Sequence, residues 1–435
     1  MISKAKKVSD YKQLTKELPT LRYVDPEHVY INLTTGRCKE YELYVNKGDH
    51  VKLGQTIGER SGGFFKQPIY ATVSGYVQDK TTMIHSTGID TECITIRNDF
   101  KDDLCEDIVD RPDSVIANMT QQDFVDIIRE KSVVGLGGSG FPSYIKLNTD
   151  KDIHTVVINA VECEPYLSSD YRLIKDRPED IFRGLEYIMQ ALDAPSGVIA
   201  IKNTKQELIE VLERELTRFK DKDIRIAKLK DYYPQGWENA TFENALGIKV
   251  PVGTLPMEYG IMGFNVSTTA WIYEAVKHNM PITERYLTVN GDAVKFPQDI
   301  RVRVGTSVQD LIKLSDGYEE SLDKIEIVIG GPMMGTSVPT DNVVVTPTTT
   351  SVLVLKSVDY KEEPCVRCGS CVYSCPVEIE PVSIMNAVKR NDHEAAKNLM
   401  ADTCIECGLC AYVCTSKIHV TDYVREGKKL IRENQ

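Results

Sequence analysis

The chain has 435 residues, of which 42% are hydrophobic and 27% are charged, a composition typical of a soluble globular protein with about three domains. Its formal net charge of -12 disfavours nucleic acid as a partner, because phosphate binding relies on clustered lysine and arginine. The sequence has no run of about 18 apolar residues and no apolar stretch after its basic start, so we expect neither a membrane span nor an export signal.

The N-terminal part predicts a small β module. Residues 1–28 are interpreted as a polar extension with no recognisable site, and residues 29–100 alternate apolar and polar positions between glycine turns, as short strands do. This pattern resembles the lipoyl/biotinyl-type barrel-sandwich, with Ser74-Gly75 at one of its turns. Lys66 lies outside any recognisable carrier motif, so we expect a structural module with no swinging arm.

A glycine-rich stretch, VVGLGGSGFPSYIKL, follows a predicted helix that contains Phe124. Its glycines match G-x-G-x-x-G, but the convincing strand comes after them, which is the wrong order for a dinucleotide fingerprint. The bare backbone would let a planar ring or a phosphate approach closely, and Pro142 is placed to begin a short helix that carries Lys146. A purely structural turn is the alternative.

Residues 114–280 as a whole predict a Rossmann-like domain. The alternating pattern gives strands at 154–160, 196–202 and 223–229, with helices at 179–192 and 204–219. Ligands of such sheets bind beyond the carboxyl ends of the strands. The polar cluster Asn159, Glu162, Cys163 and Glu164 follows the first strand, and the loop Tyr233-Pro234-Gln235-Gly236 follows the third. A solvated turn is the alternative for the polar cluster.

Residues 283–340 read as strand, strand, helix, strand, which suits a small β-grasp domain. Its glycines, Gly330, Gly331 and Gly335, are interpreted as turn formers, and residues 343–355, VVVTPTTTSVLVL, as a connector to the last domain.

The last domain, residues 355–426, contains eight of the twelve cysteines in two C-x2-C-x2-C-x3-C quartets. This spacing is that of bacterial two-cluster ferredoxins, in which the fourth cysteine of each quartet ligates the other cluster. We therefore expect one [4Fe-4S] cluster on Cys365, Cys368, Cys371 and Cys414, and another on Cys404, Cys407, Cys410 and Cys375. Zinc sites and disulfides are the alternatives, and a helix pair is expected between the quartets.

The ordered motifs GLGGSGFPSYIK, NAVECEPYL, YPQG, GGPMMG and the two quartets resemble the RnfC family, whose members belong to the Rnf complex, the membrane-associated ferredoxin:NAD oxidoreductase. The similarity covers about residues 29–426, and its middle part resembles the flavoprotein subunit of respiratory complex I. The resemblance implies an α/β multidomain fold: a barrel-sandwich, a Rossmann-like FMN and NADH domain, an SLBB-like β-grasp domain and a helical dicluster ferredoxin.

The same resemblance implies the site. By position, Gly135, Gly137, Lys146 and Asn159 would hold FMN, whereas Phe141 and Glu164 match positions that meet the nicotinamide nucleotide, with Glu164 as the catalytic group. The cofactor-binding set is completed by Gly138, Gly140, Glu162 and Gly236. The implied reaction is hydride exchange between NADH and FMN followed by one-electron steps through the clusters, because iron-sulfur clusters cannot accept a hydride.

The implied setting is a complex. The partners would be other Rnf-type membrane subunits and a ferredoxin-like electron carrier, with the chain in the cytoplasm, peripheral to the membrane. Three departures stand against this: Trp237 replaces a usual glycine, Thr415 a common proline, and the chain's start lacks the expected glycine-, histidine- and proline-containing opening. The alternatives are a soluble carrier that feeds a dedicated reductase of the proline reductase type, with an altered or vestigial flavin site, and a scaffold with structural clusters.

Overall fold

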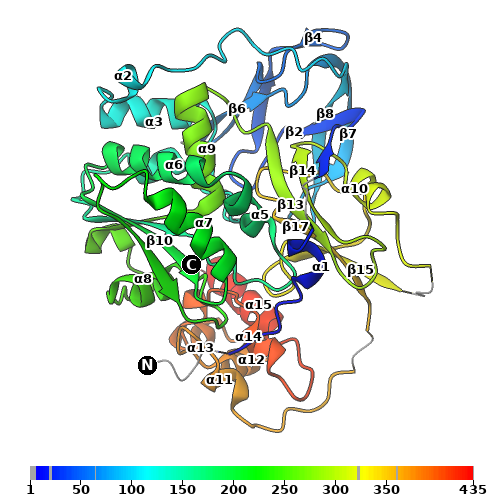
Figure 1. Cartoon of the computed structure of the whole chain (residues 1–435). Coiled ribbons are helices and arrows are strands. Elements are labelled where there is room, and N and C mark those ends of the chain that lie inside the picture. The colour runs from blue at the N-terminus through cyan, green and yellow to red at the C-terminus, as the bar shows by residue number, and fades with distance from the viewer. Residues whose placement is uncertain (1–5, 19–21, 64, 321–323, 359–360, 435) are drawn as a thin grey trace.

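The computed structural model describes residues 6–18, 22–63, 65–320, 324–358 and 361–434 (Figure 1). The first five residues of the basic start therefore lie outside the described part of the chain. Within that part, no helix is long and apolar enough to cross a membrane.

The N-terminal module consists of two antiparallel sheets that enclose one apolar core. Their strand orders are β2-β8-β7-β4 and β3-β5-β6. The bounds are β2 (His28–Asn32), β3 (Glu40–Leu43), β4 (His50–Val51), β5 (Thr56–Gly62), β6 (Phe65–Tyr70), β7 (Gly75–Ile84) and β8 (Asp90–Asn98). Val29, Ile57 and Ile96 are fully buried between the sheets. Lys66, on β6, forms a surface ion pair with Glu59.

A four-stranded parallel sheet forms the centre of the next domain, in the order β11-β10-β9-β12. Its strands are β9 (Thr155–Asn159), β10 (Ser196–Lys202), β11 (Ile224–Leu229) and β12 (Ile261–Asn265). The helices around it are α2 (Asp113–Ile116), α3 (Gln121–Glu130), α5 (Ser169–Asp176), α6 (Pro178–Ala191), α7 (Gln206–Leu216), α8 (Glu238–Leu246) and α9 (Val266–His278). The predicted strands and helices between 154 and 229 are confirmed, with ends that differ by a few residues.

Strand β12 was not predicted, and it determines where a ligand can bind. It pairs with β9 on the side opposite β10, so the direction of strand order reverses between β9 and β12. Alternate residues of β9 pack on opposite layers: Val156 and Ile158 belong to the core with α6 and α9, whereas Val157 packs with Phe242 of α8. The carboxyl ends of β9 and β12 therefore form the topological switch point, where open α/β sheets bind ligands.

A six-stranded mixed sheet follows, in the order β1-β14-β13-β17-β15-β16. Its elements are β1 (Arg22–Val24), β13 (Glu284–Asn290), β14 (Gln298–Arg303), α10 (Val308–Leu314), β15 (Ile325–Ile329), β16 (Thr336–Val338) and β17 (Ser351–Lys356). The predicted order of strand, strand, helix and strand is confirmed. The prediction that residues 343–355 only connect two domains is wrong, because β17 lies between β13 and β15 with Val352 and Val354 fully buried.

The C-terminal module is helical, with α11 (Ser370–Tyr373), α12 (Pro381–Lys389), α13 (His393–Asn398), α14 (Leu409–Tyr412) and α15 (Val420–Glu433). The predicted helix pair between the cysteine quartets corresponds to α12 and α13. Figure 1 shows this module in orange and red below the parallel sheet, with α1 (Gln13–Lys16) between it and the six-stranded sheet. Residues from the start of the chain thus lie beside its end.

Candidate functional site

The glycine-rich loop folds back on itself between α3 and α4 (Ser143–Leu147). The Gly140 N–H donates to the Gly135 carbonyl at 2.9 Å, and the Gly135 N–H to the Phe141 carbonyl at 2.8 Å. A Cβ added at Gly137 would lie 3.1 Å from the side chain of Asn265, which is tighter than most side chains tolerate. The bare backbone at Gly137 therefore allows the loop to approach the end of β12 closely.

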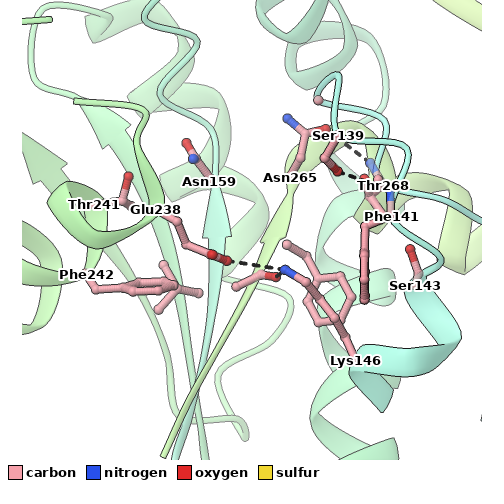
Figure 2. Close-up of a pocket in the computed structure, with 15 residues that line it drawn as sticks. Ser139, Phe141, Ser143, Lys146, Asn159, Glu238, Thr241, Phe242, Asn265 and Thr268 are labelled. Atoms are coloured by element: carbon pink, nitrogen blue, oxygen red, sulfur yellow. Dashed lines mark hydrogen bonds and ion pairs between the residues drawn. The ribbon is translucent and has the colours of Figure 1, made fainter. Parts of the chain in front are cut away.

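A cavity of about 200 Å³ lies at the switch point, between this loop, the ends of β9 and β12, and α8 (Figure 2). Five of the predicted cofactor-binding residues line it: Gly135, Gly137, Phe141, Lys146 and Asn159. The other five do not: Gly138, Gly140, Glu162, Glu164 and Gly236. Gly236 contacts a residue of the cavity lining, because its carbonyl accepts a hydrogen bond from Asn159 Nδ2 at 2.9 Å.

Further cavity residues, missed by the sequence reasoning, come from α8 and the start of α9. They are Glu238, Thr241 and Phe242 of α8, Asn265 at the end of β12, and Thr268 in the first turn of α9. Asn265 is the N-cap of α9, since its Oδ1 accepts the N–H groups of Ser267 and Thr268. The signal that could have identified it is a strand, IMGF, followed by asparagine and a helical pattern.

An ion pair spans the cavity. Lys146 Nζ, from α4, lies 3.3 Å from Glu238 Oε1 and donates to the Gly263 carbonyl at 2.8 Å (Figure 2). Its ammonium also lies 5.4 Å from the ring centroid of Phe264. The two charged side chains are 30% and 41% exposed, so their pairing is weak, and an anionic ligand could take the place of Glu238.

The chemistry of the lining suits a planar ring with an anionic group. Amide groups at Asn159 and Asn265 and hydroxyls at Thr241 and Thr268 supply polar contacts, Phe141 supplies an apolar face, and Lys146 supplies the positive charge. Together with the bare backbone of the glycine loop, this set fits the ring and phosphate of FMN.

Glu162 points away from the cavity, into a buried charge cluster. Its side chain is 3% exposed, and its Oε2 lies 3.3 Å from Lys12 Nζ and 3.4 Å from Lys205 Nζ. Burial lowers the pKa of Lys205 to about 8, although Glu162 opposes this shift. The partner lysine from the N-terminal extension was not foreseen in the sequence.

Glu164 points towards the cysteine module. It accepts the Met333 N–H at 3.1 Å, and the Tyr233 hydroxyl lies 3.2 Å from its Oε1. The same hydroxyl lies 2.8 Å from the Cys407 carbonyl oxygen, to which it donates. Burial raises the pKa of Glu164 to about 7, against the hydrogen bonds from Met333 and Tyr233. Glu164 therefore lies at the junction of three domains and not in the cavity.

Trp237 does not line the cavity. It is the N-cap of α8, where its N–H donates to the Pro234 carbonyl at 3.0 Å and its carbonyl accepts from the Thr241 N–H at 2.9 Å. The departure at Trp237, which motivated the alternative of an altered flavin site, therefore leaves the lining of this cavity unchanged.

The fold brings cysteines of the two quartets together. Cys375 lines one small cavity, of about 20 Å³, together with Cys404, Cys407 and Cys410. Next to the other three, the Ser416 hydroxyl donates to the Pro364 carbonyl at 3.0 Å, and the Glu363 N–H donates to the Ser416 carbonyl at 2.9 Å. These contacts place the turn that carries Cys414 beside the first quartet. All twelve cysteines lie in the described part of the chain, and none forms a disulfide.

The two quartets share a local geometry. The Arg367 N–H donates to the Cys365 sulfur at 3.4 Å, and the Glu406 N–H donates to the Cys404 sulfur at 3.3 Å. Gly369 and Gly408, at equivalent positions, both have φ near 75°. Two fourfold thiol sets with backbone N–H donors to sulfur fit a pair of [4Fe-4S] clusters better than zinc.

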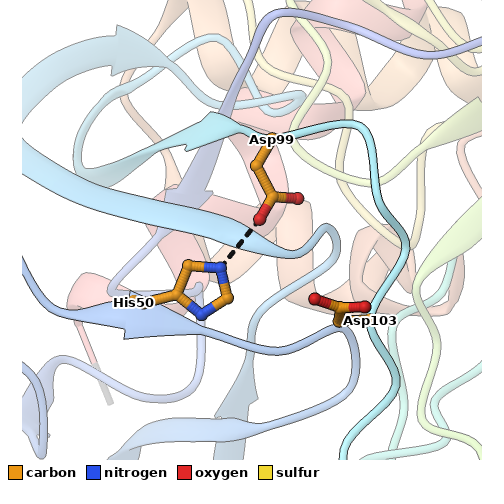
Figure 3. Close-up of side chains that lie close together, drawn as sticks. All are labelled: His50, Asp99 and Asp103. Carbon is orange, nitrogen blue, oxygen red and sulfur yellow. Dashed lines mark hydrogen bonds and ion pairs between the residues drawn. The ribbon is translucent and has the colours of Figure 1, made fainter.

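A separate group of possible metal ligands lies in the N-terminal module (Figure 3). The ligand atoms of His50, Asp99 and Asp103 lie within 4.8 Å of one another. His50 Nε2 is 2.7 Å from Asp99, which also accepts the Ser74 hydroxyl at 2.6 Å. Although burial opposes it, these hydrogen bonds lower the pKa of Asp99 to about 2. Protein contacts thus account for this group.

Comparison with known proteins agrees with this layout. Three family models match: the RnfC barrel sandwich hybrid domain over residues 3–101, the Nuo51 FMN-binding domain over 128–274, and the 4Fe-4S dicluster domain over 357–415. Among solved structures, the NAD+-reducing [NiFe]-hydrogenase in its air-oxidized state is similar in fold, with a TM-score of 0.52 and 15% identity over 74% of this chain and 69% of that chain.

Proteins similar in sequence to this chain include subunits of ion-translocating complexes. The C subunit of the Na(+)-translocating ferredoxin:NAD(+) oxidoreductase complex of Acetobacterium woodii is 33% identical over 87% of this chain and 85% of its own length. The proton-translocating counterpart of Clostridium ljungdahlii is 32% identical over 89% and 84%, respectively. At this identity and coverage, the chain belongs to the RnfC family, the C subunits of ion-translocating ferredoxin:NAD oxidoreductase complexes.

Proposed function

We propose that this protein is an electron-transfer subunit that passes electrons between NAD(H), FMN and two [4Fe-4S] clusters. The observation that supports this most is the loop from Tyr233 to Gly236, which touches both candidate redox sites. Its Tyr233 hydroxyl donates to the Cys407 carbonyl, and its Gly236 carbonyl accepts from Asn159, which lines the cavity. A flavin in the cavity and a cluster on the second quartet would thus both lie next to one loop.

In this proposal FMN occupies the switch-point cavity. Gly135 and Gly137 would let the ring approach the backbone, Asn159 and Asn265 would donate or accept hydrogen bonds, and Lys146 would hold the anionic group. When bound, the flavin supplies the ability to accept a hydride and to release its two electrons one at a time. Phe141, on the loop at the cavity edge, is the residue we propose to contact the nicotinamide nucleotide.

For the remaining predicted site residues we propose supporting roles. Gly138 and Gly140 adopt φ values of +104° and +57°, which shape the loop without lining the cavity. Glu162 and Glu164 would act outside the cavity, the first in a buried charge cluster and the second at the junction with the cysteine module. We therefore do not propose Glu164 as the catalytic group.

The two clusters would act in a defined order. Cys375 and Cys407, of the second set, are buried, and Cys407 packs in one cluster with Tyr233, whereas Cys365 and Cys368, of the first, are exposed. We propose that the second set exchanges electrons with the flavin and the first with an external partner. That partner would be another member of an ion-translocating complex or a ferredoxin-like carrier. A soluble reductase is the alternative.

Two finer assignments belong to the same proposal. Residues 283–340 would form a β-grasp domain of the SLBB type, to which β17 adds a strand between β13 and β15. The chain would attach peripherally, through its partner subunits, to the cytoplasmic face of the membrane. For the other domains we propose the limits predicted from the sequence.

The test is an anaerobic titration of the purified protein, reconstituted with iron, sulfide and FMN. We expect tightly bound FMN, about eight iron and eight sulfide per chain, and loss of flavin absorbance on addition of NADH, followed by bleaching of the clusters. A protein that binds no FMN, and whose absorbance does not change with NADH, would contradict the proposal.

A further inference from the structure

Residues 6–18 of the N-terminal extension pass the carboxyl end of the parallel sheet, where Lys12 meets the residues that follow β9; we refer to this segment as the N-terminal strap. Its first residues contact Tyr233 and the C-terminal module that carries the cysteines. Lys6 and Tyr233 exchange backbone hydrogen bonds of 2.8 and 3.3 Å, and Val8 packs in one apolar cluster with Tyr233, Cys407 and Leu409. The strap therefore lies directly on the loop that reaches the second quartet.

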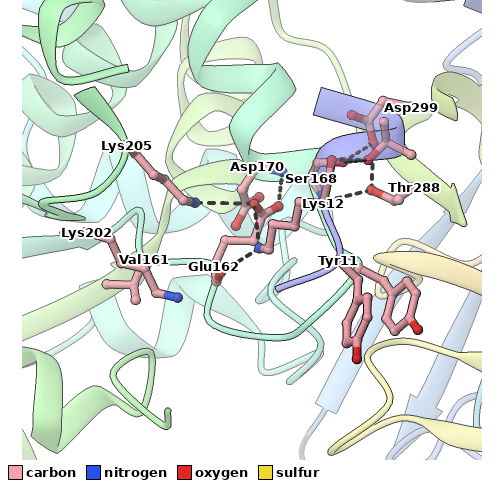
Figure 4. A network of polar contacts seen from close by, with 12 residues as sticks. Tyr11, Lys12, Val161, Glu162, Ser168, Asp170, Lys202, Lys205, Thr288 and Asp299 are labelled. Carbon is pink, nitrogen blue, oxygen red and sulfur yellow. Dashed lines mark hydrogen bonds and ion pairs between the residues drawn. The ribbon is translucent and has the colours of Figure 1, made fainter. Parts of the chain in front are cut away.

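The middle of the strap inserts a charge into the fold (Figure 4). The Lys12 residue is only 4% exposed, and its Nζ donates to the Glu162 carbonyl at 2.8 Å and lies 3.3 Å from the Glu162 carboxylate. A buried lysine is rare unless it is paired, and here its partner follows the end of β9. The strap thus supplies one of the two ammonium groups that pair with Glu162 among the described residues, and Lys205 supplies the other.

From Glu162 the contacts continue to the cavity wall. The second Glu162 oxygen accepts the Asp170 N–H at 2.7 Å, and the Asp170 carboxylate accepts Asn265 Nδ2 at 2.9 Å and the Ser267 hydroxyl at 2.6 Å. Asn265 lines the cavity opposite Gly137. An unbroken series of polar contacts therefore joins Lys12 to an amide that faces the cavity.

The strap is fixed on both sides of Lys12. Before it, the Tyr11 ring stacks on Tyr166 with centroids 4.8 Å apart and planes 9° apart, and the Asp10 carbonyl accepts the Tyr166 N–H at 2.7 Å. After it, the Thr15 hydroxyl bonds to the Ser168 hydroxyl. These contacts leave Lys12 with little freedom to leave Glu162.

We propose that Lys12 is a positioning residue for the FMN cavity: through Glu162 and Asp170 it fixes the side chain of Asn265. Because the same strap holds Tyr233, it also sets the cavity wall relative to the second cysteine quartet. The identity of the ligand rests on the proposed function; the mechanical link from strap to wall does not. The Glu162 carboxylate accepts the Asp170 backbone N–H, which brings two negatively charged side chains close together, and without the Lys12 cation we expect them to separate and Asn265 to turn.

The experiment compares Lys12→Met with Lys12→Arg and with the control Lys7→Met, an exposed lysine of the same strap. FMN affinity is measured by fluorescence titration and the flavin midpoint potential by redox titration. We expect Lys12→Met to weaken FMN binding about tenfold and to shift the potential, with Lys12→Arg closer to the unaltered protein and Lys7→Met unchanged. Equal FMN affinity and potential in Lys12→Met and Lys7→Met would overturn the proposal.

Hydrogen–deuterium exchange of the flavin-free protein gives an independent readout. We expect faster exchange in residues 261–268 for Lys12→Met than for Lys7→Met, and unchanged exchange there would overturn the inference whether or not FMN binds. If Lys12→Met does not fold, Tyr11→Ala loosens the strap without leaving a buried charge unpaired, and the same increase is expected. Absence of FMN from the unaltered protein would contradict only the proposed function.

Discussion

Replacement of Lys146 by methionine is the sharpest test of the candidate flavin cavity. The change keeps most of the stem that passes Phe264 and removes the ammonium that contacts Glu238 and the Gly263 carbonyl. A hydrogen bond from the Lys146 ammonium to FMN should contribute about 1.5–3 kcal/mol to the binding free energy. Binding also breaks the ion pair between Lys146 and the half-exposed Glu238, which costs about 0.2–1 kcal/mol. The net loss of about 0.5–2.8 kcal/mol corresponds to roughly a 2- to 110-fold rise in the dissociation constant of FMN.

The assay is quenching of FMN fluorescence during titration with anaerobic protein. Lys151→Met is a matched control, because Lys151 pairs with Glu258 at the same 3.3 Å but lies outside the cavity lining. The substitution Glu238→Gln, which removes the negative charge and keeps the shape of the side chain, should tighten FMN binding by up to about fivefold, because it removes the carboxylate that competes for Lys146. If Lys146→Met binds FMN as tightly as Lys151→Met does, Lys146 does not hold the flavin and the cavity assignment is wrong.

Three further predictions address the remaining parts of the site. Cys414→Ser should lower the iron content from about eight to about four per chain and leave the buried second cluster intact. The control Cys163→Ser should keep both clusters. Loss of only the second cluster in Cys414→Ser would refute the crossed pairing. Trp237→Gly should leave FMN affinity unchanged, because Trp237 does not line the cavity, and a clear gain would contradict that placement. The raised pKa of Glu164, about 7, means that the folded state favours its protonated form, so stability from this group is complete below about pH 4.5 and is lost as pH rises through 7. Between pH 5.5 and 8 the unaltered protein should lose about 2 kcal/mol of unfolding free energy relative to Glu164→Gln, measured by denaturant unfolding at each pH; equal pH dependence of the two would refute this.

Much of the layout follows from local patterns. The cysteine spacing predicts the crossed quartets, because short intervals between thiols restrict which sulfurs can share a cluster. The strands and helices between 154 and 229 follow from apolar periodicity, because each element buries one or two faces of its own. Gly135, Gly137 and Lys146 line one cavity, because the glycine loop and α4 are continuous in sequence.

What the patterns left open depends on residues distant in sequence. The polar cluster after β9 predicts a site at that edge, but alternation alone does not say which way Glu162 and Glu164 turn. Their direction is decided by Lys12, 150 residues earlier, and by Met333, 169 residues later. β12 and β17 were missed for a related reason: each is short, and its partner strands come from other parts of the chain.

By itself, therefore, the sequence determined the chemistry that this protein can host: eight thiols in two quartets, and a glycine loop ahead of a parallel sheet. Only the tertiary structure decided how these parts meet, through the switch point between β9 and β12, the Tyr233–Gly236 loop and the N-terminal strap. The physical reason is that ligand spacing and periodicity are properties of neighbouring residues, whereas the packing of a buried lysine such as Lys12 is specified by every element around it.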